Sequence, residues 1–176
     1  MNILDKDIFY EAAKKYGTPL YLYDLGEIKR RIKLIEDTLK DLNFKIFFAM
    51  KANSNPYLLK FMRSYGIGAD AVSLNEYKIA RFAGFSPSEI VVNGNGKSIE
   101  DISFYANEKP MCVNVDSYEE IKKIGDLPMR IALRINPNVD PKTHPHISTG
   151  LKENKFGMDF ETAKKVIRSL PNNLRL

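Results

Sequence analysis

Lys51 is the residue of this sequence whose position most clearly suggests chemistry. It directly follows Ile46–Met50, a wholly apolar run that is typical of a strand buried on both faces. Asn53–Pro56 then indicate a loop that leads into a helix. At the mouth of a buried strand, partial desolvation lowers the pKa of a lysine, and a neutral amine can attack a carbonyl to form a Schiff base. The alternative is a lysine that extends into water, and the spacing alone favours this alternative because short motifs occur by chance.

Polar side chains also accompany the later apolar runs. Ser73 and Glu76, which follow Asp70, have the spacing of a capping box, so helix capping is the alternative to a binding role. Both roles are compatible, because a capped helix start is a rigid platform for a pocket residue. Arg134 ends a later run, where it is either an exposed cation or a partner for the charges of a ligand. Two more polar residues lie just after the intervening runs, Asn93 and Asp116.

The segment Asn93–Ser98 ends in Gly-Lys-Ser before an expected helix, as phosphate-binding loops do. A P-loop needs a glycine where this chain has Val91, and a dinucleotide fingerprint needs one where it has Ile99. Both patterns therefore fail, although backbone amides at a helix N-terminus can still meet an anion. His144 and His146 lie two residues apart with no cysteine nearby, so we predict no metal site.

The apolar periodicity predicts helices and strands in alternation. Helices over 5–16 and 28–42 flank a short strand over 20–23. A strand–helix unit then repeats, with strands that start at 46, 69, 90, 111 and 131, which is every 20 to 23 residues. The expected strands of this series are 46–50, 69–72, 90–92, 111–115, 131–135 and 174–176, and the helices are 56–65, 75–83, 99–106, 118–124 and 160–170.

This alternation indicates an α/β fold with a parallel sheet, and its near-equal units favour a (β/α)8 TIM barrel over an open sheet. Barrels carry their chemistry at the carboxyl ends of the strands. About five units and the start of a sixth strand can be counted here, and an unpaired apolar edge is an aggregation hazard. We therefore expect an incomplete barrel, the N-terminal part of a longer protein. The loop from 136 to 157 is long enough to suggest a functional role.

Composition and charge narrow the function classes. Of the 176 residues, 44% are hydrophobic and 28% are charged, which is ordinary for a globular protein. No apolar run approaches a membrane span, and an N-terminus with Asp5 and Asp7 does not resemble a signal peptide. The net charge of +5 is spread along helix-like segments, so we expect no nucleic-acid partner. The single cysteine, Cys112, fits a reducing cytoplasm and lies in an apolar run, where a buried structural thiol is expected.

Two stretches carry a resemblance to known enzymes. The string Phe48-Ala49-Met50-Lys51-Ala52-Asn53 resembles the pyridoxal-phosphate lysine motif of the alanine-racemase-like, or fold-type III, decarboxylases. A longer string, from Arg134 to Pro141 and from His144 to Gly157, resembles the diaminopimelate decarboxylases within that group. The similarity begins at about Tyr16 and continues to the last residue, which makes it far more specific than a six-residue motif. Given this resemblance, Lys51 is expected to carry the cofactor.

The resemblance implies an alanine-racemase-like barrel that binds pyridoxal 5′-phosphate, followed by a C-terminal β-domain outside this chain, in a homodimer. Residues 1–24 would then form an N-terminal helix and strand, and 25–176 part of the barrel. The implied reaction is the decarboxylation of meso-2,6-diaminopimelate to L-lysine and CO2, the last step of lysine biosynthesis, which this stretch alone is not expected to catalyse. The alternatives are an ornithine- or arginine-type decarboxylase and a non-catalytic regulatory homologue.

The resemblance also implies a set of site residues and no metal. Lys51 is the catalytic lysine. The cofactor pocket is expected to contain Lys51, Ala49, Asp70, Ser73, Glu76, Asn93 and Arg134. A substrate or subunit-interface loop is expected to contribute Ser148, Thr149, Lys152 and Lys155.

Overall fold

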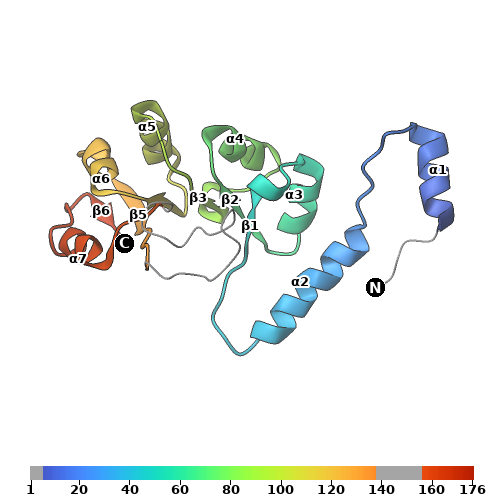
Figure 1. Cartoon of the computed structure of the whole chain (residues 1–176), viewed down its shortest axis with the longest axis horizontal. Coiled ribbons are helices and arrows are strands. Elements are labelled where there is room, and N and C mark those ends of the chain that lie inside the picture. Colours follow the sequence, from blue (N-terminus) through green and yellow to red (C-terminus); the bar gives the residue numbers. More distant parts are fainter. Residues whose placement is uncertain (1–5, 138–155) are drawn as a thin grey trace, which may run out of the picture.

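The structure, a computed structural model, describes residues 6–137 and 156–176. In these residues six strands lie side by side in chain order, and each adjacent pair is parallel (Figure 1). The strands are β1 (Phe47–Ala49), β2 (Gly68–Ala71), β3 (Ile90–Val92), β4 (Cys112–Val115), β5 (Met129–Leu133) and β6 (Leu174–Arg175). The helices are α1 (Lys6–Tyr16), α2 (Leu25–Leu39), α3 (Pro56–Arg63), α4 (Leu74–Phe82), α5 (Ile99–Glu108), α6 (Tyr118–Ile124) and α7 (Phe160–Arg168), with short 3-10 turns at Met50–Ala52 and Pro87–Glu89.

The predicted fold class is confirmed. One helix follows each of the strands β1 to β5, and β6 begins a further unit, as expected for part of a (β/α) barrel. Each of these five helices starts at a residue whose side chain accepts a hydrogen bond from a backbone N–H in the first turn, which satisfies donors that a helix leaves unpaired. The capping residues are Asn55, Ser73, Ser98, Ser117 and Asp159.

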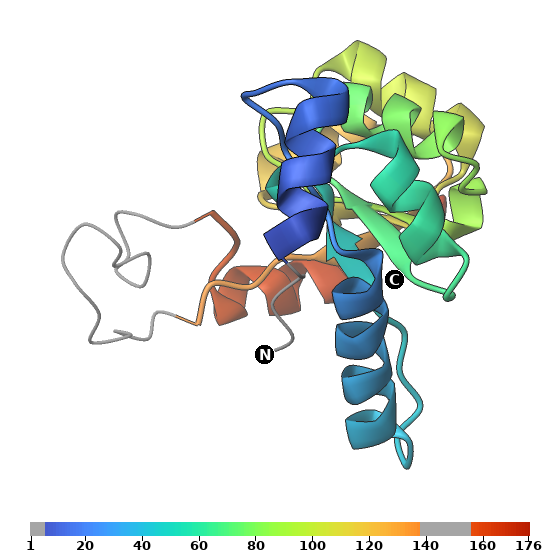
Figure 2. The same ribbon diagram turned by 90° about the vertical axis from the view of Figure 1, so that its right-hand side faces the viewer.

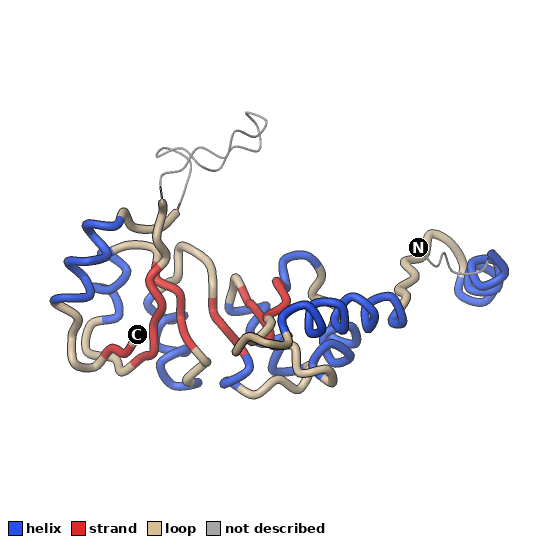
Figure 3. Tube along the Cα trace, turned by 90° about the horizontal axis from the view of Figure 1, so that it is seen from below, coloured by secondary structure: helices blue, strands red, loops and turns tan. Residues whose placement is uncertain are grey.

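Helices cover one face of the sheet. Side chains alternate between the two faces of a strand, and here one set is almost completely buried: Ala69, Ala71, Ile90, Val92, Val113, Val115 and Ile131. The other set is only half-buried: Asp70, Val91, Cys112, Asn114 and Ala132. Figure 3 shows the strands with helices packed outside them. The polar residues of the sheet therefore lie on the face that the described helices leave uncovered.

Two predictions about the first strands were wrong. Residues 20–23 form no strand: they are exposed and pair with no strand in the described part of the chain, and Tyr21 is 88% exposed. Asp24 instead caps α2 by accepting a hydrogen bond from the backbone N–H of Glu27 at 3.1 Å. Strand β1 is shorter than expected and half-buried along its length, not buried on both faces, because helices pack against one face of the sheet.

The first two helices make few contacts with the sheet and the helices packed on it. Helix α1 has no buried residue and lies apart from the other elements in Figures 1 and 3. Helix α2 buries Ile32, which packs with Leu58, Met62 and Ile67 against the side of the sheet near β1. The far end of α2 extends beyond the rest of the molecule (Figure 2). The sheet and α3 to α7 therefore form the part of the chain that positions a site.

Strand β5 lies two residues earlier than predicted, at Met129–Leu133 in place of 131–135. Beyond it, the Arg134 N–H still donates to Val115 O at 2.9 Å, and Ile135 forms an isolated parallel bridge with Met158. The two ends of the long loop after β5 are thus held together at the carboxyl edge of the sheet.

Gly94 allows close contact between two neighbouring loops at this edge. Its φ of +124° is rarely adopted by L residues, and a Cβ at this position would lie 2.3 Å from the carbonyl oxygen of Val72. We expect Gly94→Ala to lower the free energy of unfolding by roughly 2–4 kcal/mol, because strain and a backbone clash combine. Gly96→Ala is the matched control. Gly96 also has a positive φ but open space around it, so the loss should be about 1 kcal/mol. Urea titration of both variants measures the difference, and equal losses would contradict the close contact.

Candidate functional site

Asp70, Asn93 and Lys51 come from three successive βα units at the carboxyl edge of the sheet. Asp70 lies within β2, in register with Ala49 on one side and Val91 on the other. Asn93 directly follows β3, and its backbone N–H donates to Ala71 O at 2.7 Å, which extends the ladder by one residue. Lys51 lies in the 3-10 turn after β1. The parallel register therefore brings three of the predicted site residues to one end of the sheet.

The environment of Asp70 favours its protonated form. Burial raises the pKa of this carboxyl group, and the nearby charge of Glu76 raises it further, while hydrogen bonding from Asn93 and the positive charge of Lys51 act in the opposite direction. The oxygen Oδ1 of Asp70 is buried and has no hydrogen-bond partner among the described residues. A buried acceptor without a partner is costly, and it fits a ligand that brings an N–H or O–H group.

Ser73 and Glu76 differ from the predicted capping box in one bond. Ser73 caps α4 as expected, with its hydroxyl oxygen accepting from the Glu76 N–H at 3.2 Å. The Glu76 carboxylate does not return this bond to the cap. It accepts from the backbone N–H of Val72 at 2.8 Å, one residue earlier in the chain. The Glu76 side chain is thereby fixed against the end of β2, close to Asp70.

Arg134 lies at the carboxyl end of β5, and its guanidinium group is partly exposed. Its Nη1 atom is 3.4 Å from Oδ1 of Asp116, and the guanidinium lies 5.8 Å from the centroid of the Phe156 ring. Asp116 is 9% exposed, and its second oxygen, Oδ2, has no partner in the described part of the chain. The guanidinium group of Arg134 is therefore accessible, while the Asp116 carboxylate that it contacts is buried.

Lys51 is exposed, contrary to the expectation of a desolvated amine at a strand mouth. The reason is that the turn Met50–Ala52 carries the lysine away from β1, and β1 itself is only half-buried. Ala49 ends β1 beside Asp70. Of the predicted residues, the structure brings Lys51, Asp70, Glu76 and Asn93 together, and Arg134 lies farther along the same edge.

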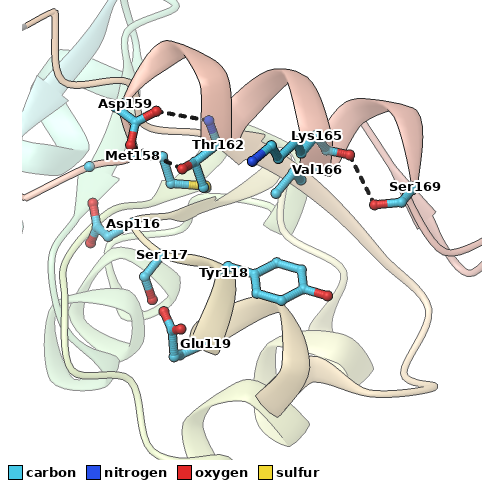
Figure 4. A pocket seen from close by; sticks show the side chains of 11 residues that line it. Asp116, Ser117, Tyr118, Glu119, Met158, Asp159, Thr162, Lys165, Val166 and Ser169 are labelled. Carbon is cyan, nitrogen blue, oxygen red and sulfur yellow. Dashed lines mark hydrogen bonds between the residues drawn. The ribbon is translucent and has the colours of Figure 1, made fainter.

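One cleft among the described residues was not predicted. It has a volume of about 620 Å³ and lies between the start of α6 and one side of α7 (Figure 4). Asp116 and Ser117 line one wall, and Lys165 of α7 and Ser169, just after this helix, line the other. The sequence does show a Ser or Asp cap at the start of each of these two neighbouring helices. Such caps predict where the helices begin, but not that a cleft lies between them. Lys51 is not part of this cleft.

Some predictions fall outside the described residues. Ser148, Thr149, Lys152 and Lys155, with His144 and His146, lie between 138 and 155. Within the described ranges, no group of three or more His, Cys, Asp or Glu side chains is arranged to hold a metal. Nor is any of the helices described there long and apolar enough to cross a membrane. Burial raises the pKa of the Cys112 thiol, which is half-buried, so this cysteine is poorly suited to act as a nucleophile.

The sequence also matches a known family over most of its length. The family model described as "Pyridoxal-dependent decarboxylase, pyridoxal binding domain" matches residues 25–176, which is most of the chain.

The chain belongs to the family of pyridoxal-dependent decarboxylases.

Several relatives within this decarboxylase family are diaminopimelate decarboxylases. The chain is 42% identical over 161 residues to the one from Helicobacter pylori, covering 88% of this chain and 40% of the relative. It is 41% identical over 175 residues to the one from Methanocaldococcus jannaschii, covering 90% and 39%. The crystal structure of the H. pylori enzyme complexed with L-lysine matches with a TM-score of 0.87 at 38% identity, over 94% of this chain and 44% of that one. The chain therefore spans about two-fifths of the length of these relatives.

Decarboxylases of other specificity share only the fold. The lysine/ornithine decarboxylase from Vibrio vulnificus matches with a TM-score of 0.80 at 18% identity, over 98% of this chain and 45% of that one. These matches confirm the predicted parallel (β/α) architecture of the decarboxylase family.

The buried carboxyl group of Asp70 gives a prediction for stability. Because its pKa is raised in the folded state, the folded protein binds this proton more tightly than the unfolded chain. The contribution of Asp70 to stability is therefore present below its ordinary pKa and is lost as pH rises through the raised value. We expect Asp70→Asn to stabilise the unliganded protein at pH 7 by roughly 1 kcal/mol and to have little effect at pH 3.

Thermal unfolding at the two pH values checks this expectation. Asp126→Asn, at an exposed aspartate after α6, is the control and should change neither midpoint. Destabilisation by Asp70→Asn at pH 7 would show that the ionised carboxylate is well satisfied in the fold.

Proposed function

We propose that this chain is the pyridoxal-phosphate-binding part of a diaminopimelate decarboxylase, which converts meso-2,6-diaminopimelate to L-lysine and CO2. The observation that supports the proposal is the 42% identity to the H. pylori diaminopimelate decarboxylase across 88% of this chain. The relative's structure is described as a complex with L-lysine, the product of that reaction. The reaction would be the last step of lysine biosynthesis.

The ornithine and arginine alternatives have less support from sequence identity. The Vibrio vulnificus lysine/ornithine decarboxylase and a Chlorella virus arginine decarboxylase are 18% and 22% identical to this chain. Such values support a common fold and say nothing about the substrate. The diaminopimelate decarboxylases of H. pylori and M. jannaschii, at 42% and 41%, are much closer in sequence.

The carboxyl edge of the sheet fits the cofactor. An exposed lysine amine, Lys51, can reach an aldehyde, and Arg134 offers a positive charge for a phosphate or a carboxylate. Asp70 supplies an acceptor oxygen without a partner among the described residues. We propose that these residues hold pyridoxal 5′-phosphate together with Ala49, Ser73, Glu76 and Asn93. When bound, the cofactor supplies an electron sink for the pair of electrons that the departing CO2 leaves behind.

The protein's own residues would bind the cofactor and the substrate and orient them. Lys51 would hold the cofactor and, when released from it, would be the residue that carries a proton for the reaction. Glu76, anchored on the Val72 N–H, lies beside Asp70 and contributes to the raised pKa of the Asp70 carboxyl group. Arg134 is held by Asp116 and keeps its remaining N–H groups for anionic groups of the ligand.

The remaining parts of the proposal concern surroundings of the site. We propose that Ser148, Thr149, Lys152 and Lys155 belong to a loop at the substrate or at a subunit interface of a homodimer. Residues 1–24 would be a separate N-terminal segment before the barrel portion, 25–176. A cytoplasmic location is supported by the single cysteine, since proteins of oxidising compartments use cysteines in pairs.

Cofactor attachment at Lys51 can be tested directly. The complete protein that contains this chain would be loaded with pyridoxal phosphate, reduced with borohydride, digested and mapped by mass spectrometry. We expect a pyridoxyl group on Lys51, and we expect Lys51→Ala to lower kcat by at least about 10³-fold because the covalent attachment is lost. Lys60→Ala, at an exposed lysine on α3, is the control and should keep both the adduct and the activity. An adduct on another lysine, or on none, would refute the assignment.

Substrate choice separates the enzyme hypotheses. Diaminopimelate has a second amino acid end with one charge of each sign, and a site built for it leaves polar groups unpaired when ornithine binds. Such sites discriminate by about 10⁴-fold or more in kcat/KM. CO2 release by the complete protein would be measured with diaminopimelate, ornithine and arginine in turn. Faster turnover of ornithine or arginine would overturn the substrate assignment, and bound cofactor without turnover of any of them would identify a regulatory homologue.

A further inference from the structure

Lys97 has a structural environment that the sequence did not predict. It belongs to the segment that resembles a phosphate-binding loop, yet its side chain is 6% exposed and points into the protein. Its ammonium group donates to three acceptors: Gly94 O, Asn114 O at 2.7 Å and Glu120 Oε1 at 2.7 Å. A lysine has three N–H donors, so all of them are used. Lys97 is therefore not available to bind a phosphate.

Glu120 is the buried counterpart of this lysine. Its side chain is 9% exposed, and its two oxygens have different partners. Oε1 accepts from Lys97, and Oε2 accepts from the backbone N–H of Asp116 at 2.9 Å. The Glu120 backbone N–H in turn donates to Ser117 Oγ, the cap of α6. Neither charge is left without a partner, which is the condition under which a buried ion pair is tolerated.

The pair connects two βα units at the carboxyl edge. On one side, the bond to Gly94 O fixes the loop after β3, where the Gly94 N–H donates to the Asn93 side chain at 3.0 Å. On the other side, the bond from the Asp116 N–H to Glu120 fixes the residue that holds Arg134. Lys97 also holds the end of β4 through Asn114 O.

We propose that Lys97 and Glu120 are positioning residues: their buried ion pair aligns Asn93 and Arg134 for the cofactor. This role rests on the proposed function. The two residues act through the loop after β3 and through Asp116, not by touching the reacting atoms. Polar edge residues on short loops need such support, because a binding group displaced by an ångström loses much of its effect.

The double variant Lys97→Met with Glu120→Gln tests the proposal in the complete protein. It removes both charges together, so no buried charge is left alone, and glutamine can still accept from the Asp116 N–H. Two measurements are made: hydrogen exchange of the Gly94–Ser98 amides without cofactor, and the dissociation constant of pyridoxal phosphate from its visible absorbance. We expect the amides to exchange at least 10-fold faster and the cofactor to bind at least 10-fold more weakly, while the unliganded protein still unfolds cooperatively.

Two further variants complete the test. Glu161→Gln with Lys164→Met removes an exposed ion pair on α7, in which the atoms are 2.9 Å apart, and should change neither measurement. Lys97→Met alone leaves the Glu120 charge buried, so its thermal midpoint should fall further than that of the double variant.

The outcomes separate this proposal from the proposed function. Wild-type cofactor affinity in the double variant would overturn the positioning role, and so would a loss of affinity no larger than its unfolded fraction explains. If the wild-type protein itself does not bind the cofactor, the proposed function fails. Hydrogen exchange then still decides whether the pair orders the loop, and unchanged exchange would overturn the proposal by itself.

Discussion

Parallel pairing of consecutive strands is the constraint on which the rest of this structure depends. Each strand must be followed by a segment that returns the chain to the opposite edge, and in the described residues a helix does this after each of β1 to β5. All the carboxyl ends then meet at one edge. Residues far apart in the sequence, Lys51, Asp70 and Asn93, become neighbours there, close enough for Asn93 to bond to the Asp70 carboxyl group. The position of a site follows from the pairing, and its chemistry follows from the residues placed at that edge.

The same pairing divides the side chains of the sheet into two sets with different roles. Ala69, Ala71, Val113 and Val115, like the larger Ile90, Val92 and Ile131, are almost fully buried under the helices and contribute to the hydrophobic stabilisation of the sheet. Asp70 and its neighbours on the other face are only half-buried. Burial is thus sufficient to raise the pKa of a carboxyl group and still leave it accessible. A site of this kind needs both properties, because a fully buried charge would neutralise and a fully exposed one would be screened.

Much of this arrangement could be predicted from the sequence, and the exceptions have physical reasons. The strand–helix period located β3 and α6 to the residue and placed Asn93 and Asp116 just after their strands. Residues 20–23 have the composition of a strand, but a strand requires a partner that local sequence does not reveal. The exposure of Lys51 depends on a 3-10 turn after β1. The burial of Lys97 depends on Glu120, which is distant in sequence. Pairings of this kind are tertiary, so neither period nor motif predicts them.

Two copies of one local pattern show how similar sequences acquire different roles. Ser73 and Glu76 follow β2 as Ser117 and Glu120 follow β4, and in both units the carboxylate accepts from the N–H that precedes the serine. Glu120 is neutralised by Lys97 from the loop after the preceding strand. Among the described residues Glu76 forms no ion pair, and its charge acts on Asp70. At Glu120 the lysine of the preceding loop, Lys97, closes a buried ion pair. At Glu76 the lysine of the preceding loop, Lys51, is exposed and forms no such pair among the described residues. The capping geometry is common to both units, and they differ in whether the lysine of the preceding loop pairs with the glutamate.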